Sequence, residues 1–293
     1  MTYAVILNYN SWQESLILYT SLVELSRPDL KVIVLDNNSS ETDKNHLERN
    51  IPAGDFIQNK QNLGYAGGNN VGVKKALEEG AEYIWILNPD IRITTSSLEI
   101  LINSLEKNPK LAAVGPRIRS RENPDLIFTD GENLILDKEC RTFHLNYNVP
   151  FKDIAPRINF DIDYIDGSSI FIRSQALLDI GIFSEHYFLY FEETDWCLRA
   201  RSKGWKIAIN SNAEVFNITS EKGKLFHFYM NRNRLILCKK YHPDFRSVLW
   251  FHAKKLFEEL MNRIKGEAYL KPYYFARCKG FLAGLIKSKL TWT

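Results

Sequence analysis

Residues 31–40 read KVIVLDNNSS, a β-branched and apolar run that ends in an aspartate and two asparagines. A run this short and this apolar predicts a strand that is buried on both faces of a sheet. YAVILNYN (3–10) and AEYIWILNPDI (81–91) repeat the pattern, an apolar run followed by polar residues. LAAVGPRI (111–118) predicts a further strand.

Helical segments separate these strands. Residues 12–26 predict one helix, and residues 95–109 predict another that begins after a serine and ends at Asn-Pro. NLGYAGGNNVGVKKALEEG (62–80) predicts a glycine-rich loop that leads into a helix ended by Gly80. Alternating buried strands and helices predict an α/β fold with a mostly parallel central sheet flanked by helices.

The second half of the chain has a mixed pattern. Residues 119–160 are irregular, whereas FDIDYIDGSSIFIRSQALLDIG (160–181) predicts a strand, a tight turn, a second strand and a helix. Residues 191–205 predict a helix ended by Gly204, and residues 206–217 predict a returning strand.

The domain organisation follows from these patterns. We expect one domain over residues 1–235, with halves at 1–118 and 119–235, and a helical C-terminal extension over 236–293. Of the 293 residues, 45% are hydrophobic and 25% charged, as in an ordinary globular chain. The start of the sequence shows no signal-peptide pattern, and no apolar run has the length of a membrane span.

Charge is distributed unevenly along the chain. The net charge is +3, yet residues 239–289 hold twelve Lys or Arg and four Asp or Glu, a net of +8, which leaves −5 for the rest. This basic segment predicts an anionic partner. The four scattered cysteines show neither a metal-binding spacing nor a disulfide framework, which favours a reducing compartment.

Polar side chains follow three of the predicted strands. The carboxyl ends of parallel strands meet at one edge of a sheet, where ligands of such sheets bind. Polar groups from three strand ends therefore predict a binding site at that edge. The residues concerned are Tyr9, Asn10, Asp36, Asn37, Asn88 and Asp90.

The segment FLYFEETDWCLRAR (188–201) places three carboxylates within four positions, and we expect its aromatic residues to enclose them. One explanation is structural, because a helix that begins near Glu192 favours acids in its first turn and Asp195 could pair with Arg199. The other explanation is catalytic, because apolar neighbours desolvate a carboxylate and raise its basicity.

The glycine-rich loop with Gly64, Gly67 and Gly68 matches neither a dinucleotide fingerprint nor a phosphate-binding Walker loop. Its glycines allow close approach of the backbone to a ligand, or they form a tight turn before a helix. Asp90 follows a proline at a strand end, where a carboxylate suits a divalent cation.

Together these segments resemble the family 2 inverting glycosyltransferases of the GT-A fold, and most closely the bacterial rhamnosyltransferase-like branch that builds surface polysaccharides. The matching stretches lie in the family's order between residues 5 and 235: ILNYN, VLDNNSS, NLGYAGGNNVG, WILNPD, DGSSIFIRSQALLDIGIF, FLYFEETDWCLRARSKGW and FYMNRNRL.

The resemblance implies a nucleotide-sugar-binding half at 1–118 and an acceptor and catalytic half at 119–235. By position, Tyr9 and Asn10 would line the nucleobase pocket, and Asp36 would hydrogen-bond the uracil or thymine ring. Asn62 and Gly64 would lie along the nucleotide.

A Mg²⁺ or Mn²⁺ ion is also implied by the resemblance. Asn88 and Asp90 stand on the family's Asp-x-Asp motif, although Asn88 replaces its first acid. Asn217 stands where relatives often have a metal-binding histidine, so Asp90 and Asn217 are the expected ligands.

The catalytic assignment comes from the family's Glu-Asp-x-Asp motif, which falls on residues 192–195. Its second acid is the general base, so this role falls on Glu193, which replaces the usual aspartate. Glu192 and Asp195 flank it. Arg232 and Arg234 would face the leaving diphosphate, or else form a charged pair on a helix surface.

The implied function is inverting transfer of a sugar from a nucleoside-diphosphate sugar to a saccharide acceptor. The resemblance favours dTDP-rhamnose as donor, with UDP-hexoses as the alternative, and a lipid-linked acceptor. The expected location is cytoplasmic, peripheral at the inner face of the plasma membrane, with no nucleic acid as partner.

Two functions other than sugar transfer make different demands on the sequence. A sugar-nucleotide pyrophosphorylase would need a glycine- and lysine-rich loop, which NYNSWQESL (8–16) lacks. A catalytically degenerate nucleotide-sugar-binding scaffold is favoured by Asn88 and Asn217 but opposed by the intact acidic cluster at 192–195.

The C-terminal extension carries an amphipathic pattern. FRSVLWFHAKKLFEELMNRI (245–264) predicts a helix with an apolar stripe and flanking lysines. Such a stripe is compatible with an anionic membrane, with a second subunit in a homodimer, or with packing on the chain's own core. The stripe comprises Leu249, Ala253, Leu256, Leu260 and Ile264.

Overall fold

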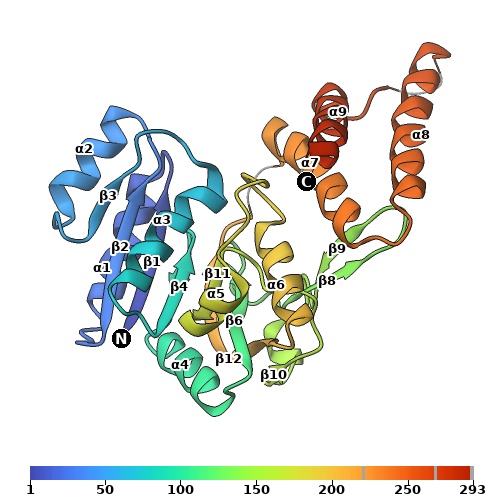
Figure 1. Ribbon diagram of the computed structural model, residues 1–293. Helices are drawn as coiled ribbons and strands as arrows, with labels where there is room; N and C mark the ends of the chain where they lie inside the picture. Colours follow the sequence, from blue (N-terminus) through green and yellow to red (C-terminus); the bar gives the residue numbers. More distant parts are fainter. Residues whose placement is uncertain (220–221, 267–268, 291–293) are drawn as a thin grey trace. The chain divides into compact units, whose positions relative to one another are not determined.

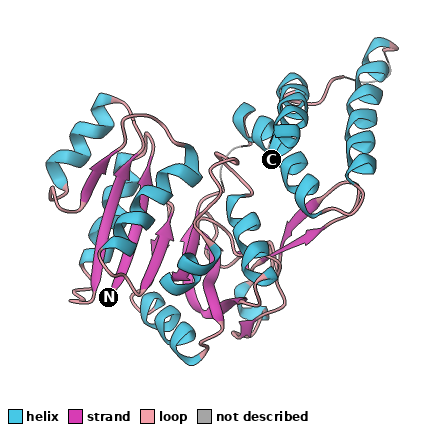
Figure 2. Cartoon of the chain, viewed as in Figure 1, coloured by secondary structure: helices cyan, strands magenta, loops and turns pink. Residues whose placement is uncertain are grey.

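The apolar runs form one large sheet in this computed structural model, which describes residues 1–219, 222–266 and 269–290 (Figures 1 and 2). The strand order is β10-β12-β6-β11-β4-β1-β2-β3. The strands are β1 (Thr2–Asn8), β2 (Leu30–Asp36), β3 (Phe56–Gln58), β4 (Tyr83–Leu87), β6 (Leu111–Ser120), β10 (Ile158–Asn159), β11 (Ser169–Arg173) and β12 (Lys206–Asn217).

The sheet is mostly parallel, as predicted. Strands β3, β2, β1 and β4 run parallel to one another, and β6 pairs with β12 in the same direction. Between β4 and β6 lies β11, which is antiparallel to both. Short β5 (Arg92–Ile93) pairs with β12, and β7 (Ile127–Thr129) pairs with β6.

Helices cover both faces of the sheet. Apolar residues of α1 (Trp12–Val23), α2 (Glu41–Asn50) and α4 (Ser97–Lys107) pack with alternate strand residues such as Ile6 and Val34. The intervening strand residues, Val5, Leu7 and Leu35, contact α3 (Gly64–Glu78) on the other face. The first helix ends at Val23, three residues before the predicted end.

The predicted glycine-rich loop is wrong, because helix α3 already begins at Gly64. Gly68 and Gly72 lie inside the helix, where an added Cβ would come within 2.6 Å of Leu7 and 2.7 Å of Leu35. These glycines therefore allow the helix to pack closely on β1 and β2. Gly80, with φ of +76°, follows the helix end as predicted.

The second half agrees in part with its prediction. Helix α5 (Ser174–Ile180) follows β11, and α6 (Glu192–Ser202) is followed by Gly204 at φ of +84°. A strand was expected at the start of 160–181, but only Tyr164 makes a bridge there, to Glu132. The backbone instead runs irregularly toward the turn before β11.

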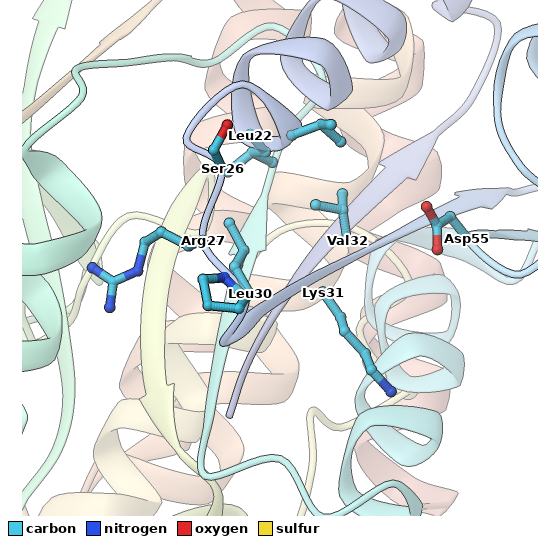
Figure 3. Close-up of a pocket in the computed structure, with 9 residues that line it drawn as sticks. Leu22, Ser26, Arg27, Leu30, Lys31, Val32 and Asp55 are labelled. Atoms are coloured by element: carbon cyan, nitrogen blue, oxygen red, sulfur yellow. The ribbon is translucent and has the colours of Figure 1, made fainter.

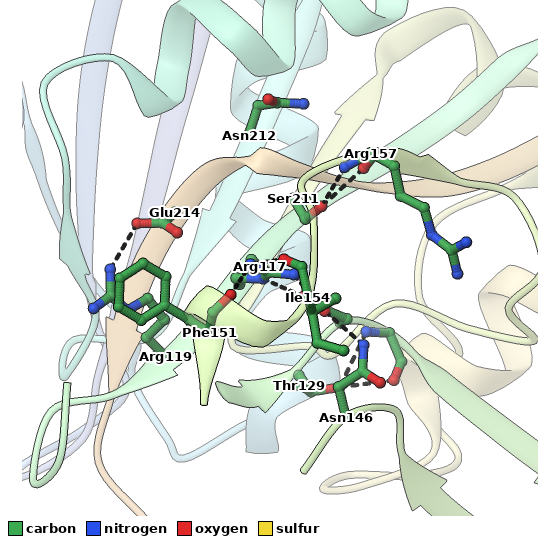
Figure 4. A network of polar contacts seen from close by, with 12 residues as sticks. Arg117, Arg119, Thr129, Asn146, Phe151, Ile154, Arg157, Ser211, Asn212 and Glu214 are labelled. Carbon is green, nitrogen blue, oxygen red and sulfur yellow. Dashed lines mark hydrogen bonds and ion pairs between the residues drawn. The ribbon is translucent and has the colours of Figure 1, made fainter. Parts of the chain in front are cut away.

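Arginines of β6 contact irregular stretches at Asp130 and at residues 151–154 (Figure 4). Buried Arg117 makes a bidentate ion pair with Asp130, at 2.7 and 2.8 Å, and also donates to the carbonyl of Ile154. The guanidinium of Arg119 lies 3.6 Å from the ring centre of Phe151. A segment without continuous secondary structure is thereby ordered by charge-assisted hydrogen bonds.

The described residues divide into two compact units. The first comprises residues 1–133, 144–188 and 192–219, and the second comprises 134–143, 189–191 and 220–293. The second contains helices α7 (Lys224–Tyr241), α8 (Phe245–Ile264) and α9 (Tyr274–Leu290), with the adjoining residues of the hairpin β8 (Glu132–Ile135) and β9 (Arg141–His144).

Helices α7 and α9 pack closely through small residues. Ala276, Gly280, Gly284 and Ser288 recur every fourth residue on α9 and are buried. A Cβ on Gly280 would lie 2.2 Å from the carbonyl oxygen of Phe228 on α7. The absence of a Cβ at Gly280 and Gly284 lets the two backbones approach.

Candidate active site

The carboxyl ends of β1 and β2 meet in a network of buried polar groups. Asn8 Nδ2 donates to Asp36 Oδ1 at 3.0 Å, and Asn8 Oδ1 accepts from the Ser15 hydroxyl at 2.8 Å. Asp36 is fully buried, and its second oxygen accepts from the amide of Ser39. Tyr9 has half of its surface exposed beside this network, so its ring is accessible to a planar ligand.

The other residues expected along the nucleotide shape loops at the same edge. Asn10 has a left-handed backbone, with φ of 54°, and its Oδ1 accepts from the amide of Ser40 at 2.8 Å. Asn62 Oδ1 accepts from the amide of Gly64 at 2.8 Å and from Asn37 Nδ2 at 3.0 Å. Both asparagine side chains are thus fixed by the protein itself.

Helix α3 anchors the loop that precedes α6. Asn70 Nδ2 donates to the carbonyl of Phe183 at 2.9 Å, and its Oδ1 accepts from the Phe183 amide at 3.2 Å. At the start of α3, the amide of Tyr65 donates to the carbonyl of Phe188 at 2.5 Å. A Cβ on Gly64 would lie 2.4 Å from that oxygen, so the contact requires glycine.

This loop stores backbone strain. Phe188, Tyr190 and Phe191 have φ values of 64°, 70° and 72°, in the left-handed region that bulky side chains rarely adopt. Each such residue costs on the order of 1–3 kcal/mol. The strained residues immediately precede the acids at 192 and 193, where strain of this kind is compatible with a functional constraint.

The turn before β11 is a meeting point for several elements. The amide of Asn88, at the end of β4, donates to the carbonyl of Ser168 at 2.8 Å. The Tyr65 hydroxyl donates to the carbonyl of Gly167. A Cβ on Gly167 would lie 3.5 Å from Glu193 Cγ. The turn thus brings α3, β4 and the start of α6 together.

Glu192 and Glu193 begin helix α6. Glu192 is 3% exposed, and its Oε2 is a buried atom with no hydrogen-bond partner among the described residues. Glu193 Oε1 accepts from the Thr194 hydroxyl at 3.1 Å. A carboxylate is most stable ionised when its oxygens accept several hydrogen bonds, so both groups favour the protonated form.

Burial raises the pKa of both acids. The pKa of Glu193 rises to about 7 through burial, with Asp166 and Glu132 adding to the effect. Burial and the charge of Glu193 raise the pKa of Glu192 well above its ordinary value. Burial, together with Glu192, Glu193 and other carboxylates, does the same to Tyr65. Burial thus disfavours the ionised form of both carboxyl groups, and the pKa of Glu193 lies near neutral pH.

Asp195 has a different environment. It is buried, and its Oδ2 accepts from Arg199 Nε at 2.8 Å, as the i to i+4 spacing predicted, although the pair is not on the surface. Arg199 also donates to the carbonyls of Ile180 and Ile182. Asp195 therefore holds α6 against the loop after α5.

Trp196 lies four residues after Glu192 in helix α6. Its indole is fully buried, and its N–H donates to the carbonyl of Gly181 at 2.8 Å. Phe183 packs edge-on against it at 6.3 Å. Trp196 therefore packs α6 against the segment from Gly181 to Phe183.

Asp90 fits a cation ligand. Its Oδ1 is buried and has no hydrogen-bond partner among the described residues. Burial raises its pKa, and the carboxylates of Glu14 and Asp166 add to the rise. Arg121 donates to the Asp90 carbonyl at 2.9 Å and to Glu14 at 2.9 Å. A buried carboxylate oxygen without a hydrogen-bond partner is suited to bind a divalent cation.

Asn217 lies at the end of β12. Its backbone carbonyl accepts from the amide of Arg121, the residue that contacts Asp90. Its Oδ1 accepts from the amide of Ile218 at 2.8 Å. The structure thus places Asn217 on the same edge as Asp90, with one lone pair of its oxygen already used.

A second group of metal-type ligands lies nearby. One ligand atom each from Glu132, His144 and Asp166 lies within 4.8 Å of the others, a spacing that could hold a metal ion. His144 Nδ1 contacts the Glu132 carboxylate, and the Tyr164 hydroxyl donates to the same carboxylate at 3.2 Å. Burial raises the pKa of Glu132.

Arg232 and Arg234 belong to helix α7 of the second unit. Arg234 Nε donates to the carbonyl of Cys140 at 3.2 Å, which fixes the hairpin to the helix. Burial lowers the pKa of both guanidinium groups. Arg232 lies 5.4 Å from the ring centre of Tyr229.

A hollow lies at the amino end of β2 (Figure 3). It has a volume of about 390 Å³, and Leu22, Leu30 and Val32 line it. Arg27 at its rim is paired with Asp29 at 2.8 Å. Since ligands of such sheets bind at the carboxyl ends of the strands, this hollow lies apart from the candidate site.

Sequence reasoning missed Tyr65, Asn70, Glu132, His144 and Asp166 as members of the site. Asp166 had a signal, because it opens the Asp-Gly-Ser-Ser turn within a stretch already singled out, and Tyr65 and Asn70 likewise lie in NLGYAGGNNVG. The others come from separate segments that only the folded chain brings together.

Comparison with known proteins extends this description. A model of the family described as glycosyl transferase family 2 matches residues 3–181. A low-salt glycan biosynthesis hexosyltransferase of Haloferax volcanii is 28% identical over 206 residues, which cover 69% of this chain and 62% of that protein.

Two further relatives are rhamnosyltransferases. A dTDP-rhamnosyl transferase of Shigella flexneri is 23% identical over 95% of this chain and 94% of its own length. An N-acetylglucosaminyl-diphospho-decaprenol L-rhamnosyltransferase of Mycobacterium tuberculosis is 24% identical over 64% of this chain and 66% of its own.

Solved structures share the fold at low identity. GalNAc-T7 with UDP, GalNAc and Mn²⁺ superposes with a TM-score of 0.62 at 12% identity, over 84% of this chain and 52% of its own. A mannosyltransferase of Pyrobaculum calidifontis with GDP-Man and Mn²⁺ gives 0.57 at 12% identity, over 99% and 86%. The architecture is thus the GT-A fold predicted from the sequence.

Proposed function

Because this chain belongs to glycosyl transferase family 2, we propose that it transfers a sugar from a nucleoside-diphosphate sugar to a saccharide hydroxyl with inversion. The observation that carries this proposal is Glu193, a carboxyl group with a pKa raised to about 7 beside the turn that joins α3, β4 and α6. A general base is most effective when its pKa lies near the working pH.

In the proposed reaction, the Glu193 carboxylate accepts the proton of the acceptor hydroxyl. The acceptor oxygen attacks the anomeric carbon from the face opposite the diphosphate, and the bond from that carbon to the diphosphate oxygen breaks. The nucleoside diphosphate leaves with the electron pair of this bond. Burial raises the pKa of Glu192, which disfavours a second negative charge beside Glu193.

For the donor we propose dTDP-rhamnose, with UDP-hexoses as the alternative. Support comes from the resemblance of the sequence and from the Shigella flexneri relative, which matches this chain over nearly its whole length. Tyr9, with its accessible ring, and Asp36 and Asn10 at the neighbouring loops are proposed to form the nucleobase end of the site.

A divalent cation, Mg²⁺ or Mn²⁺, is proposed at Asp90, with Asn217 as a further ligand. When bound, such an ion neutralises developing charge on the diphosphate. The buried, unpartnered oxygen of Asp90 supports this assignment. Glu132, His144 and Asp166 form the competing ligand set.

The acceptor is proposed to be a lipid-linked saccharide. The Mycobacterium tuberculosis relative supports this choice, because its name specifies a decaprenol-linked acceptor. We propose accordingly that the protein works at the cytoplasmic face of the plasma membrane in surface polysaccharide synthesis.

The decisive experiment incubates the purified protein with dTDP-, UDP- and GDP-sugars and measures release of nucleoside diphosphate, with and without added saccharide acceptors. The expected result is release from dTDP-rhamnose that the correct acceptor accelerates, with a product of inverted anomeric configuration. If the protein binds a nucleotide sugar but neither hydrolyses nor transfers it, the chain is a nucleotide-sugar-binding scaffold instead.

A further inference from the structure

Helix α8 is oriented with a polar face toward its own unit. Glu259 makes a bidentate ion pair with Arg277 of α9, at 2.7 and 3.0 Å, and Lys255 pairs with Glu139 at 3.2 Å. Val248, on the same side of the helix, is fully buried. The inward face of α8 is therefore held largely by charged pairs.

The apolar face of α8 points away from these contacts. Trp250, Phe257 and Ile264 follow one another at seven-residue intervals and are 72%, 62% and 67% exposed. Leu260 lies between the last two on the same face and is exposed as well. At 100° per residue, the apolar positions other than Phe251 between Leu249 and Ile264 span an arc of about 140°. An arc this wide normally packs against a core.

Helix α9 repeats the arrangement. Phe275, Leu282 and Ile286 are 70%, 57% and 60% exposed, and they lie on one face at helical spacing. Lys279 is exposed on that same face. The inward face of α9 consists of the small residues that pack on α7. Both helices therefore present large apolar side chains to solvent.

Positive charge borders the exposed apolar face of α8. Arg246, Lys254, Arg263 and Lys265 are all exposed. Glu258, the acid nearest to this face, is already paired with Lys254 at 3.6 Å. From residue 269 to 290 the chain contains five Lys or Arg and no Asp or Glu. Among the described residues 245–266 and 269–290, the border of this face thus offers no free acid to a second positively bordered copy.

We propose that the exposed apolar faces of α8 and α9 bind an anionic lipid surface. Aromatic and aliphatic side chains on an amphipathic helix insert at the boundary of headgroups and acyl chains, while flanking lysines and arginines attract anionic headgroups. No helix within residues 1–219, 222–266 and 269–290 is long and apolar enough to span a bilayer, so the helices lie along its surface. The inference is independent of the transfer reaction.

The test is co-sedimentation of the full chain with vesicles of phosphatidylcholine alone or with phosphatidylglycerol. We expect binding to the anionic vesicles at low salt, weaker binding at high salt, and quenching of Trp250 fluorescence by brominated lipid. The double variant Phe257→Ser/Ile264→Ser should lose at least tenfold in vesicle affinity. Leu178→Ser, at an equally exposed leucine of α5, is the matched control and should bind normally.

Two further double variants, with the same change in net charge, distinguish an effect of the charges that border α8 from an effect of the net charge of the chain. Arg246→Glu/Lys265→Glu should weaken anionic binding, whereas Lys107→Glu/Lys110→Glu, with the same change in net charge at the end of α4, should not. Donor hydrolysis by all four variants should equal that of the parent chain. If the parent stays in the supernatant at low salt, the proposal is wrong. It is equally wrong if ultracentrifugation shows a dimer that Phe257→Ser/Ile264→Ser dissociates.

Discussion

The backbone amide of Tyr65 donates a hydrogen bond to the carbonyl oxygen of Phe188, with the two atoms 2.5 Å apart. This contact joins the first turn of α3 to the strained loop that ends at the acids of α6. The placement of Glu193 therefore depends on Tyr65, which lies 128 positions earlier in the chain. Gly64 makes the contact possible.

Gly64→Ala should lower both stability and turnover. The added Cβ would lie 2.4 Å from the Phe188 carbonyl, and the backbone φ of +73° disfavours alanine, so we expect a loss on the order of 1–3 kcal/mol. Chemical unfolding and single-turnover kinetics measure the two effects. Gly54→Ala is the control, because its Cβ meets nothing within 4 Å. Equal behaviour of the two variants would show that α3 does not position the loop.

Glu193→Gln should keep donor binding and reduce turnover by about a hundredfold or more, the usual scale for loss of a general base. Calorimetry with the nucleotide sugar and steady-state kinetics separate binding from chemistry. Glu192→Gln should retain most of the activity, because burial raises the pKa of Glu192 and so already disfavours its ionised form. A dead Glu192→Gln beside an active Glu193→Gln would exchange the two roles.

The pH dependence of kcat/KM should follow the ionisation of Glu193. Only the carboxylate accepts a proton, so kcat/KM should fall about tenfold per pH unit below about 7 and level off above it. A profile that stays flat from pH 5 to 8 would exclude Glu193 as the base.

The ionisation of Glu193, which raises kcat/KM as the pH rises, lowers the stability of the folded chain over the same range. The pKa of Glu193 is about 7 in the folded chain and about 4.3 in the unfolded chain. Between these two pH values, the folded chain therefore binds more protons than the unfolded chain. This contribution to stability is present at low pH and is lost as the pH rises through about 7. Thermal melts should show that Glu193→Gln gains stability relative to the parent chain on going from pH 5 to pH 8.

Asp90→Asn should weaken Mn²⁺ binding in the presence of nucleoside diphosphate by about ten- to a hundredfold. Electron paramagnetic resonance of free Mn²⁺ gives the affinity without relying on activity. His144→Gln is the comparison, because His144 belongs to the competing ligand set. If His144→Gln releases the ion and Asp90→Asn does not, the ion lies with Glu132 and Asp166.

Much of the sheet was predictable because its strands are short and apolar on both faces. The run KVIVL became β2, and the polar residues after it lie at the carboxyl edge as expected. Gly67 and Gly68 were misassigned because glycine in a sequence indicates a turn, whereas Gly68, like Gly72, meets a requirement for close helix packing. That requirement comes from Leu7, Val5 and Leu35, which are distant in sequence.

The candidate site was predictable only where its residues form local patterns. Glu192 and Glu193 stand in a recognisable cluster, and Asp90 ends a strand. Tyr65 and Asn70 lie in a recognisable stretch, but their roles depend on contacts with the loop from Phe183 to Phe188. Asp195 looked like Glu193 in the sequence, but its pairing with Arg199 gives it a structural task.

The left-handed backbone at Tyr190 also bears on how the protein can be engineered for heat resistance. Asparagine or glycine adopts a φ of 70° with much less strain than tyrosine, so Tyr190→Asn should raise the melting temperature. Selection for thermostability alone would therefore favour this exchange, whereas selection for turnover would oppose it if the tyrosine ring serves the reaction. A library scored separately for both properties should show the two scores diverging at position 190.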